Sequence, residues 1–349
     1  MKDPMGTTTK PASQRLSWQQ AVANYQKPDL LRSVWQLVNT LIPYCLLWYV
    51  MYRSLEVSYW MTLALAFPTA GFLVRIFIIF HDCGHGAFFK SQRANDIVGF
   101  VTGVLTMTPY HGWRHEHATH HATAGDLDRR GVGDIWTLTV KEYLALPPWE
   151  RWKYRLYRNP LVMFLFGPLF VFLIRHRFAQ RDARKRERYS VYWTNLALAG
   201  IVIVMSVTIG LTSFVLVQLP IIVIAAAAGI WLFYVQHQYE GVYWERHNKW
   251  DYVTVALEGS SFYKLPKVLQ WFTGNIGFHH VHHLSPRIPN YYLERCHNAD
   301  PMFQQVKAIT LWPSLKSISF RLWDEDRHEL VGFDSLKTLQ EEQASSPRR

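Results

Sequence analysis

Long apolar runs separated by polar stretches predict four helices that cross a membrane. The runs lie at 33–52, 60–80, 191–211 and 214–235, and each contains 20 to 22 residues. Arg75, near the end of the second run, is the one charged residue within them. A bilayer core of about 30 Å requires about 20 apolar residues in a helix. The short separators within each pair of runs therefore predict two helical hairpins.

Two further apolar runs are too short to cross. Residues 98–110 contain two glycines, and residues 161–174 are interrupted by Gly167 and Pro168. Runs of 13 and 14 residues suit interfacial or re-entrant segments better than spans. We therefore expect an all-α membrane protein with four transmembrane helices, interfacial helices and a cytoplasmic cap of helices.

The same pattern divides the chain into three parts. We expect a polar N-terminal tail at 1–32, an integral membrane domain at 33–300 and a cytoplasmic extension at 301–349. The polar end of this extension, from about Glu341, is expected to be disordered. The N-terminal stretch shows no apolar core followed by a cleavage site, so we expect no removable signal peptide.

The composition supports the membrane assignment and narrows the chemistry. Hydrophobic residues make up 49% of the 349 residues and aromatic residues 15%, including 15 Trp. This aromatic content is typical of proteins with belts at the membrane interface. The three cysteines, Cys45, Cys83 and Cys296, are isolated from one another, which excludes a dense disulfide framework and a CxxC zinc knuckle.

Three histidine clusters predict a metal centre. His81 and His85 are spaced i, i+4, and two other clusters share the spacing i, i+3, i+4: His117, His120, His121 and His279, His282, His283. On a helix such positions lie on one face, so each cluster can direct its imidazoles to one point. Neutral imidazole is the commonest metal ligand, and a set without matching thiolates suits iron, copper, zinc or nickel.

The clusters can share a metal centre only if they lie on one face of the membrane. The first hairpin returns the chain to its starting side before His81, and the second hairpin lies between the second and third clusters. A crossing at 161–174 would strand the third cluster on the opposite side. This requirement independently predicts an interfacial segment there.

The charges indicate which face this is. Basic blocks at 151–158 and 175–188 lie on the histidine side, whereas the loops at 53–59 and 210–213 hold a single Lys or Arg, Arg53. By the positive-inside rule the histidine side is cytoplasmic. This arrangement also explains the formal charge of +11 without nucleic acid as a partner. Basic groups near the site could also hold an anionic lipid head group or an acidic redox partner.

Some histidines near the clusters do not fit their spacing. His111 and His115 flank the second cluster and favour a surface or supporting role, while His280 should point away from the ligand face. His237 stands alone at the mouth of the last span, where its position leaves a metal ligand and an interface residue equally open. The remaining histidines are expected on the surface: His176, His247, His297 and His328.

Two polar residues are candidates for orienting the imidazoles. Asp82 follows the first histidine, and carboxylates often hold metal-bound imidazoles in position, although a solvated acid is an equal alternative. Asn275 precedes the third cluster and is a weaker candidate for the same role.

At this point the motifs resemble those of the membrane fatty acid desaturases. HDCGH at 81–85, WRHEHATHH at 113–121 and FHHVHH at 278–283 match the HxxxH, HxxHH and HxxHH boxes of that family. QHQYEGVYW at 236–244 and TGNIGFHHVHHLSPRIPNY at 273–291 are most similar to the omega-6 (Δ12-type) branch in its bacterial versions. The resemblance covers about residues 35 to 300.

The resemblance implies a non-haem di-iron centre on the cytosolic side of four transmembrane helices. It also implies that His237 is a ligand, completing the set His81, His85, His117, His120, His121, His237, His279, His282 and His283. The acyl-CoA branch has an Asn four residues before its equivalent of His237. Here that position is Phe233, so the feature does not carry over, and Asn275 is a candidate substitute.

The implied reaction is insertion of a cis double bond, of Δ12 or omega-6 type, into a lipid-linked acyl chain with O2 and two external electrons. The His-Pro-Gly-Gly haem motif of a fused cytochrome b5 domain does not occur, so the donor should be separate, ferredoxin-like or cytochrome b5-like. The expected location is the bacterial inner membrane, with both termini and the metal site on the cytoplasmic side.

Two alternatives remain open at the level of sequence. A related di-iron hydroxylase, ketolase or acetylenase acting on lipid or carotenoid would use the same boxes. A non-catalytic metal-binding or transport protein would place histidine pairs within the spans, lining a path. The clustered histidines lie outside the apolar runs, which disfavours the second alternative.

Overall fold

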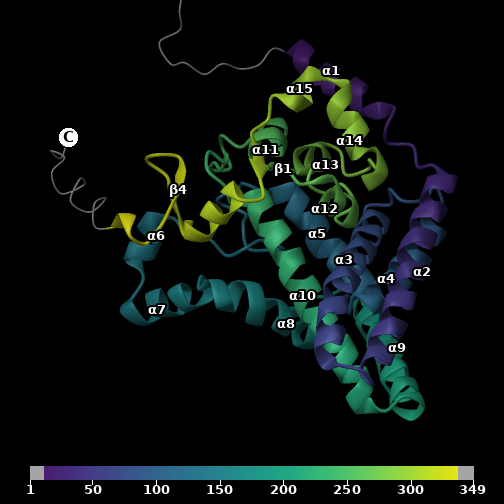
Figure 1. The fold of residues 1–349 in the computed structure, drawn as a ribbon. Coiled ribbons are helices and arrows are strands. Elements are labelled where there is room, and N and C mark those ends of the chain that lie inside the picture. The colour runs from purple at the N-terminus through teal and green to yellow at the C-terminus, as the bar shows by residue number, and fades with distance from the viewer. Residues whose placement is uncertain (1–11, 337–349) are drawn as a thin grey trace, which may run out of the picture.

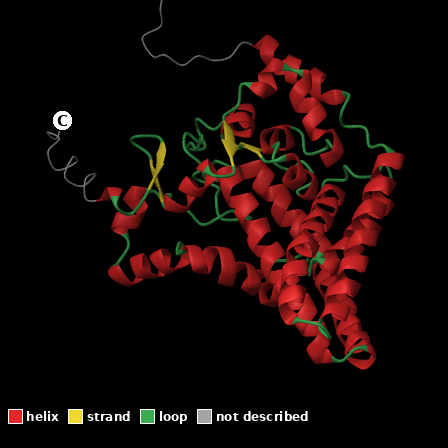
Figure 2. Ribbon diagram, viewed as in Figure 1, coloured by secondary structure: helices red, strands yellow, loops and turns green. Residues whose placement is uncertain are grey.

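The computed structural model of the chain describes residues 12–336 and is mostly helical (Figures 1 and 2). Four long helices form a bundle, and shorter helices form a cap over one end of it. The long helices are α2 (Leu30–Ser54), α3 (Tyr59–Gly84), α9 (Lys185–Thr208) and α10 (Leu211–His237). Within the described residues, these four are long and apolar enough to cross a membrane, which confirms the four predicted spans.

All four helices extend beyond the apolar runs, and in three of them the extension is informative. α3 runs on to Gly84, α10 ends at His237, and α9 begins at Lys185, six residues before its apolar run. Backbone hydrogen bonds between i and i−4 continue through polar residues, whereas hydropathy marks only the part that suits lipid. Histidines expected beside spans therefore lie on the last turns of the spanning helices.

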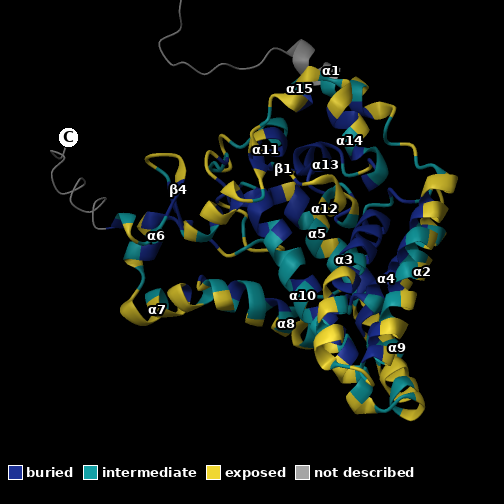
Figure 3. Ribbon diagram, in the orientation of Figure 1, coloured by how far each residue is buried: buried dark blue, intermediate teal, exposed yellow. Residues whose placement is uncertain are grey.

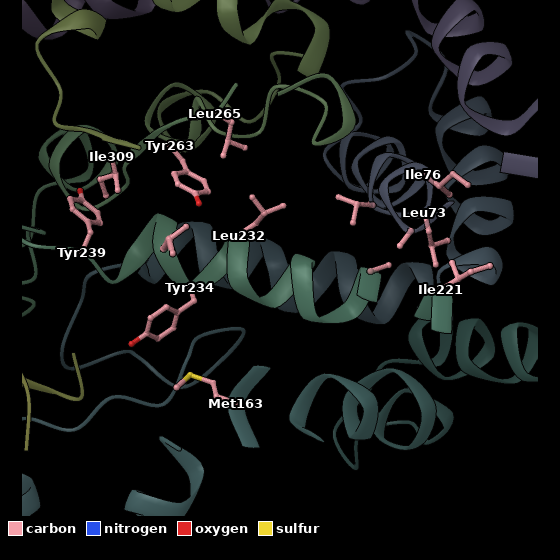
Figure 4. Close-up of a cluster of buried hydrophobic side chains, with 14 of the residues drawn as sticks. Leu73, Ile76, Met163, Ile221, Leu232, Tyr234, Tyr239, Tyr263, Leu265 and Ile309 are labelled. Carbon is pink, nitrogen blue, oxygen red and sulfur yellow. The ribbon is translucent and has the colours of Figure 1, made fainter. Parts of the chain in front are cut away.

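The burial of the bundle is typical of a membrane protein. Large apolar side chains such as Trp60 and Val207 are about four-fifths exposed on the outer faces of the spans. Figure 3 shows this exposure along the lower part of the bundle, while the interior around α3 is buried. α3 packs against α2, α4 and α10 and is the most buried of the four spans. Figure 4 shows part of this core, where Leu73 and Ile76 of α3 lie near Ile221 of α10.

Helices α4 (Gln92–Leu105) and α5 (Tyr110–Thr123) bring the second histidine cluster to the end of α3. The 14 residues of α4 span about 21 Å, which is shorter than a bilayer core, as expected for residues 98–110. Gly99 allows the close approach of α5, because a Cβ there would lie 2.2 Å from a ring carbon of Tyr110.

A broken helical arm extends sideways from the bundle at the level of α8 (Figure 1). Its elements are α6 (Val140–Ala145), α7 (Pro148–Tyr157), η1 (Val162–Phe166), α8 (Gly167–Leu169), η2 (Phe170–Ile174) and η3 (Arg175–Arg177). The segment after α7 is bent by 60° from it, and the two would form a fifth crossing only if they acted as one span. Trp149 and Trp152 are stacked and exposed on α7, which suits the interfacial position predicted for 161–174.

The cap follows α10 and includes four short strands among its helices. Its elements are α11 (Tyr252–Glu258), β1 (Phe262–Lys264), α12 (Lys267–Phe272), α13 (His279–Leu284), α14 (Asn290–Ala299), α15 (Pro301–Gln304), β2 (Ala308–Thr310), η4 (Pro313–Ser319), β3 (Leu322–Asp324) and β4 (Glu329–Val331). β1 pairs with β2 in parallel and β3 pairs with β4 antiparallel. The C-terminal extension thus contributes strands that pack on the membrane domain.

The N-terminal end of the described chain also packs on this cap. α1 (Ala12–Ala23) lies against α14, and its Val22 is almost fully buried in a cluster with Ile288 and Leu293. The N-terminal segment thus includes a packed helix in addition to polar sequence. The end from about Glu341, expected to be disordered, lies outside the described residues.

Candidate metal centre

Four segments carry the clustered histidines to one place at the junction of bundle and cap. His81 lies on the last turn of α3, and His85 directly follows that helix. The second cluster lies on the last two turns of α5 and the third on α13, whereas His237 is the last residue of α10. The helical spacing inferred from sequence is therefore realised in α5 and α13.

The histidines form two adjacent groups. The ligand nitrogens of the first group all lie within 4.8 Å of one another: His81, His85, His117, His121 and His282. The second group has the same spacing and contains His120, His237 and His283. His279 joins the second group, because its Nε2 lies 3.0 Å from that of His237 and 3.1 Å from that of His283. All nine residues of the expected ligand set are thus brought together.

The arrangement of the nitrogens suits two metal ions. His237 Nε2 lies about 3 Å from Nε2 of both His120 and His279. A neutral imidazole carries one N–H proton, so three ring nitrogens this close together cannot all be paired by hydrogen bonds with one another. In the first group, Nε2 of His121 is 3.1 Å from Nε2 of both His117 and His282. Cations between these nitrogens would satisfy them, which hydrogen bonds among imidazoles cannot do.

The protonation of the cluster fits the same interpretation. Burial lowers the pKa of these imidazoles well below the ordinary histidine value, and the neighbouring histidines lower it further; the residues concerned are His85, His117, His121, His279, His282 and His283. The imidazoles are therefore neutral at neutral pH. Neutral imidazole is the form that binds metals.

Asp82 lies behind the first group, where the sequence suggested it. Its Oδ1 is 3.3 Å from Nδ1 of His81. Its Oδ2 accepts hydrogen bonds from the backbone N–H and side-chain amide of Asn290, at 2.6 and 2.8 Å. Asn290 is held in turn by Gln36 of α2, so a buried polar chain connects the first span, the cap and His81.

Asn275 lies one step further out than the sequence suggested. Its side chain donates to the carbonyl of Asn290 and accepts from Gln270, and its hydrogen bonds do not include a histidine. Its φ of 59° places it in the left-handed region, which Asn tolerates better than most residues. It supports the loop that supports Asp82.

The second group has a carboxylate that the sequence analysis missed. Asp134 Oδ1 lies 2.5 Å from Nδ1 of His120, and its Oδ2 accepts from the N–H of Gly131. Gly133, in the same turn, has a positive φ, and a Cβ there would lie 3.0 Å from the carbonyl of Glu116. The Gly-x-Gly-Asp sequence at 131–134 is thus a signal for a tight turn against α5 that aims a carboxylate.

The histidines set aside from the ligand set lie outside both groups. His111 accepts a hydrogen bond from Arg186, and His115 is exposed. His280 is fully buried, with its Nε2 3.1 Å from both His297 Nδ1 and the carbonyl of Phe303. The expectation that His297 is a surface residue was wrong: it packs between Phe262 and Phe278 and is 7% exposed.

Of the other three histidines expected on the surface, two are exposed and one is not. His247 and His328 are more than half exposed and lie in ion-pairing distance of Asp126 and Glu245. His176 is half-buried and lies against Phe172, so its expected surface position was also wrong. It belongs to η3 of the arm and lines a cavity beside the bundle, which the local sequence does not reveal.

A large apolar cavity runs alongside the histidines. Its volume is about 950 Å³, and His81, His117 and His279 form part of its wall. In one direction it continues between α3 and α10, past Leu73, Ala225 and Gly229. In the other direction it is bordered by polar side chains, which are Glu116, Arg175, His176 and Gln180. The cavity therefore offers an apolar path past the histidines that begins at a polar border.

Phe233 lies between this cavity and two histidines of the second group. Its ring lies 5.1 Å from the rings of both His120 and His237, and it lines the cavity, as His279 of the same group also does. The cavity therefore has an apolar ring on the side of His120 and His237. It occupies the position where the acyl-CoA branch was noted to carry Asn.

The chain matches known proteins over most of its length. Residues 58–310 match the family model described as "Fatty acid desaturase". A protein of Bacillus subtilis (strain 168) named "Fatty acid desaturase" is 54% identical over 318 residues, which cover 91% of this chain and 90% of that protein. The "sn-1 oleoyl-lipid 12-desaturase" of Synechocystis sp. is 28% identical over 287 residues, or 76% and 77% of the two chains.

A second Synechocystis protein, named "sn-1 acyl-lipid omega-3 desaturase (ferredoxin)", is 27% identical over 248 residues, which cover 64% of this chain and 63% of that protein. The family match spans more than half of the chain and includes all three histidine boxes. The Bacillus relative extends the similarity over nearly the full length of both chains. The chain therefore belongs to the fatty acid desaturase family of oxidoreductases.

Proposed function

We propose that this protein holds two iron ions between its nine clustered histidines and inserts a cis double bond into a lipid-linked acyl chain. The observation that carries the proposal is the contact between the cavity and the metal centre. An apolar cavity of about 950 Å³ passes His81, His117 and His279, so a chain inside it would have methylene groups beside the metals. This volume lies in the range of sites for organic ligands.

The donor set is compatible with iron, and the proposed reaction selects it. Nine imidazoles in two groups, without a thiolate among them, suit iron, copper, zinc or nickel. Two bound irons would supply the oxidising power, drawn from O2 and external electrons, that an unactivated methylene C–H bond requires. Asp82 and Asp134 would orient one imidazole in each group through its Nδ1.

The overall reaction balances with two electrons from outside. One –CH2–CH2– unit, O2, two electrons and two protons give one –CH=CH– unit and two molecules of water. The substrate gives up two hydrogens, and a side-chain base is not required for their removal. The protein's contributions are to hold two adjacent methylenes beside the histidines and to keep bulk water out, which Phe233 and the apolar cavity wall can do.

The cavity suggests how the substrate lies. Its polar border, where Arg175 and Gln180 both approach Glu116, suits the ester and head group of a lipid. Its apolar end between α3 and α10 suits the methyl end of the acyl chain. The chain would therefore enter with its head group on the side that carries the histidines.

We propose Δ12 or omega-6 regiochemistry as the finer assignment. It rests on the motifs flanking the third box and on relatives named 12-desaturases that are 27% and 28% identical. The Bacillus relative at 54% identity is named without a position, so the position needs a direct measurement. We also propose a separate electron donor of the ferredoxin or cytochrome b5 type, a class to which the name of one Synechocystis relative refers.

The decisive experiment is expression of the protein in a bacterium that makes monounsaturated but not dienoic fatty acids, together with a reduced ferredoxin system. Gas chromatography of the membrane lipids, with location of the double bonds, should show new dienoic chains. A product heavier by one oxygen would identify a hydroxylase instead. Unchanged lipids, in the presence of iron-loaded protein and an active donor, would contradict the proposal.

The proposed location is the bacterial inner membrane, with both termini and the histidines facing the cytoplasm. Single cysteines test it after replacement of the exposed Cys45. In intact cells whose outer membrane has been permeabilised, a membrane-impermeant thiol reagent should label Val57→Cys and Thr212→Cys, which lie at the hairpin loops. Lys90→Cys, on the histidine side, should react only after lysis, and the reverse pattern would overturn the orientation.

A further inference from the structure

One strongly basic surface lies directly over the first histidine group. It consists of residues 90–96, 111–115 and 181–188, which we call the α5 basic surface. These segments hold eight Lys or Arg against three Asp or Glu, a net charge of +5. The other loops beside the histidines, 126–134 and 245–251, hold four Lys or Arg against five Asp or Glu. The positive charge is therefore concentrated on one side of the metal centre.

Contacts between three helices join these segments into one surface. Asp96 of α4 lies 2.8 Å from Arg186 of α9 and 3.6 Å from Arg114 of α5. Arg186 also donates to His111, whose backbone N–H donates to Ser190. One carboxylate shared by two guanidinium groups leaves the junction positive. Arg186 is 66% exposed and Arg114 36% exposed, so both are accessible to a partner.

The two least buried histidines of the first group lie beside this surface. Of the five histidines in the first group, His85 and His117 are only partly buried, whereas the other three are buried. Arg114 precedes His117 by three residues on α5, which is about 4.5 Å along the helix.

An aromatic ring spans the remaining gap. The indole of Trp113 stacks on His117 with ring centroids 4.4 Å apart and an interplanar angle of 19°. It also lies 5.6 Å from the ring of His81. Trp113 is only partly buried and is next to Arg114 in the sequence. Its ring therefore connects the basic surface with His117 and His81.

We propose that the α5 basic surface is the docking site for an acidic electron-transfer protein, which delivers the two external electrons over the His85–His117 side of the metal centre. The inference rests on the proposed function, because it assigns a place to the donor that this reaction requires. Complementary charge accelerates such encounters and fixes their orientation, and its effect is screened by salt. A patch with a net charge of +5 beside the least buried histidines would attract an acidic protein and orient it towards the metal centre. An anionic lipid surface is the competing occupant, because residues 181–184 directly precede the α9 span and residues 185–188 form its first turn.

The test is a triple charge reversal, Arg93→Glu, Arg114→Glu and Arg186→Glu, in the full-length iron-loaded protein. The matched control is Lys141→Glu, Lys249→Glu and Lys307→Glu, which changes the net charge equally at exposed positions on other surfaces. With reduced plant-type ferredoxin as the probe, the first variant should raise the KM for ferredoxin at low salt about tenfold or more. The KM for the lipid substrate should stay the same, and the control should resemble the unmodified protein.

A single-turnover measurement separates this proposal from the proposed function. Protein reduced chemically, without ferredoxin, should desaturate one equivalent of lipid equally well in the triple variant and the control. If that turnover is absent from the unmodified protein, the function itself is wrong. If the KM for ferredoxin is unchanged while binding to phosphatidylglycerol vesicles is lost, the surface holds lipid and the docking proposal is overturned. Equal ferredoxin kinetics in all proteins would overturn it as well.

Discussion

At the scale of single residues, the metal centre is built from imidazoles that are held from behind. One carboxylate serves each histidine group: Asp82 faces His81, and Asp134 faces His120. A hydrogen bond from Nδ1–H fixes both the tautomer and the rotation of a ring, so Nε2 is left to face the metal. The ninth histidine, His237, lies between His120 and His279 and completes the second group.

His237→Ala should therefore lose iron and activity as severely as His120→Ala. Each change removes an imidazole from the smaller group, and a desaturation rate reduced by more than about 100-fold is expected. Iron per protein, measured by mass spectrometry on the purified variants, should fall together with activity. His115→Ala, on the exposed side of α5, is the matched control and should retain both. Full activity in His237→Ala would break the nine-ligand proposal.

Asp134→Asn should weaken iron binding or activity by about 10- to 100-fold without preventing folding. The amide keeps the shape of the side chain but cannot accept from Nδ1–H as a carboxylate does, and it permits the wrong tautomer of His120. Asp128→Asn is a suitable control, because Asp128 lies in the same loop but bonds with Arg246 and the backbone N–H of His247 instead of a histidine of the cluster. Equal iron affinity in the two variants would show that Asp134 does not orient the ring.

The sequence predicts the clustered imidazoles and Asp82 beside them, but not Asp134 or Asn290. The spacing i, i+3, i+4 is local, so the helix alone decides that His117, His120 and His121 point the same way. Asp134 lies 14 residues after His120 across an irregular loop, and Asn290 lies 208 residues after Asp82. Contacts of this kind depend on how the chain folds back, which periodicity does not encode.

At the scale of helices and strands, the arm and the end of α10 are joined by a buried guanidinium. Arg158, at the end of α7, is fully buried, and all the partners of its side chain are neutral. These partners are the carbonyls of Trp136 and Phe320, the hydroxyls of Thr137 and Tyr234, and the amide oxygen of Gln238. Since Gln238 follows His237, the same contacts steady the end of the helix that carries the ninth histidine.

Arg158→Met should lower the stability of the protein by about 3 kcal/mol, because several buried acceptors would lose their donor. The thermal midpoint in detergent, followed by fluorescence-detected gel filtration, should drop by several degrees. Lys153→Met is the control on the same helix, where an exposed pair with Glu150 contributes little. A midpoint equal to that of the control would mean that water replaces the lost hydrogen bonds.

Helix α10 also contains the residues that should limit acyl chain length. Ala225, Gly229 and Phe233 follow one another at i, i+4 and i+8, and all three line the cavity. A Cβ at Gly229 would meet nothing within 4 Å, so there is room for a larger side chain to project. The small residues thus keep the apolar end of the cavity open.

Gly229→Leu should shift the substrate range towards shorter acyl chains. Turnover of the longest substrates should fall about tenfold, while shorter ones are affected less, since an apolar pocket discriminates by roughly 10- to 200-fold per methylene. Competition between phospholipids of different acyl length, read by mass spectrometry, measures the shift. Gly200→Leu on α9 is the matched control, because its Cβ also meets open space but it does not line the cavity. An unchanged range would mean that the acyl chain does not extend between α3 and α10.

The elements themselves were largely predictable, with informative exceptions. Hydropathy located all four spans, because lipid demands a long apolar run wherever a helix crosses. It did not predict the four strands, each of three residues, since β1 and β2 pair across more than 40 residues of chain. Nor did it predict that α1 would pack on α14, because that contact depends on a cap surface formed by distant sequence.

At the scale of the whole molecule, the metal centre lies where bundle and cap meet. Its histidines come from α3, α5, α10 and α13, with His85 just after α3, so they cover both hairpins, the connecting region and the cap (Figure 1). Two metals bound there would cross-link parts of the chain up to about 200 residues apart. A ligand that binds the folded state stabilises it by mass action.

Removal of iron should therefore lower the thermal midpoint of the whole protein. At metal concentrations about 1,000 times the dissociation constant, the loss corresponds to about 4 kcal/mol. Treatment with a strong ferrous chelator, followed by thermal unfolding in detergent, measures it, and added Fe2+ should restore the midpoint. The double variant His120→Ala, His237→Ala should respond less to the chelator. An equal response would point to metal bound elsewhere.

The origin of the histidines also sets the order in which the protein can be made. By the time the first 180 residues have left the ribosome, five of the nine imidazoles are present, and His282 of the first group has not been synthesised. The second hairpin must then insert to deliver His237, and the cap must follow to deliver α13. The first group is complete only at residue 282 and the second only at residue 283. The two proposed irons would therefore be bound only after both hairpins have inserted and α13 has been made, so metal loading would be a late step in the assembly of the protein.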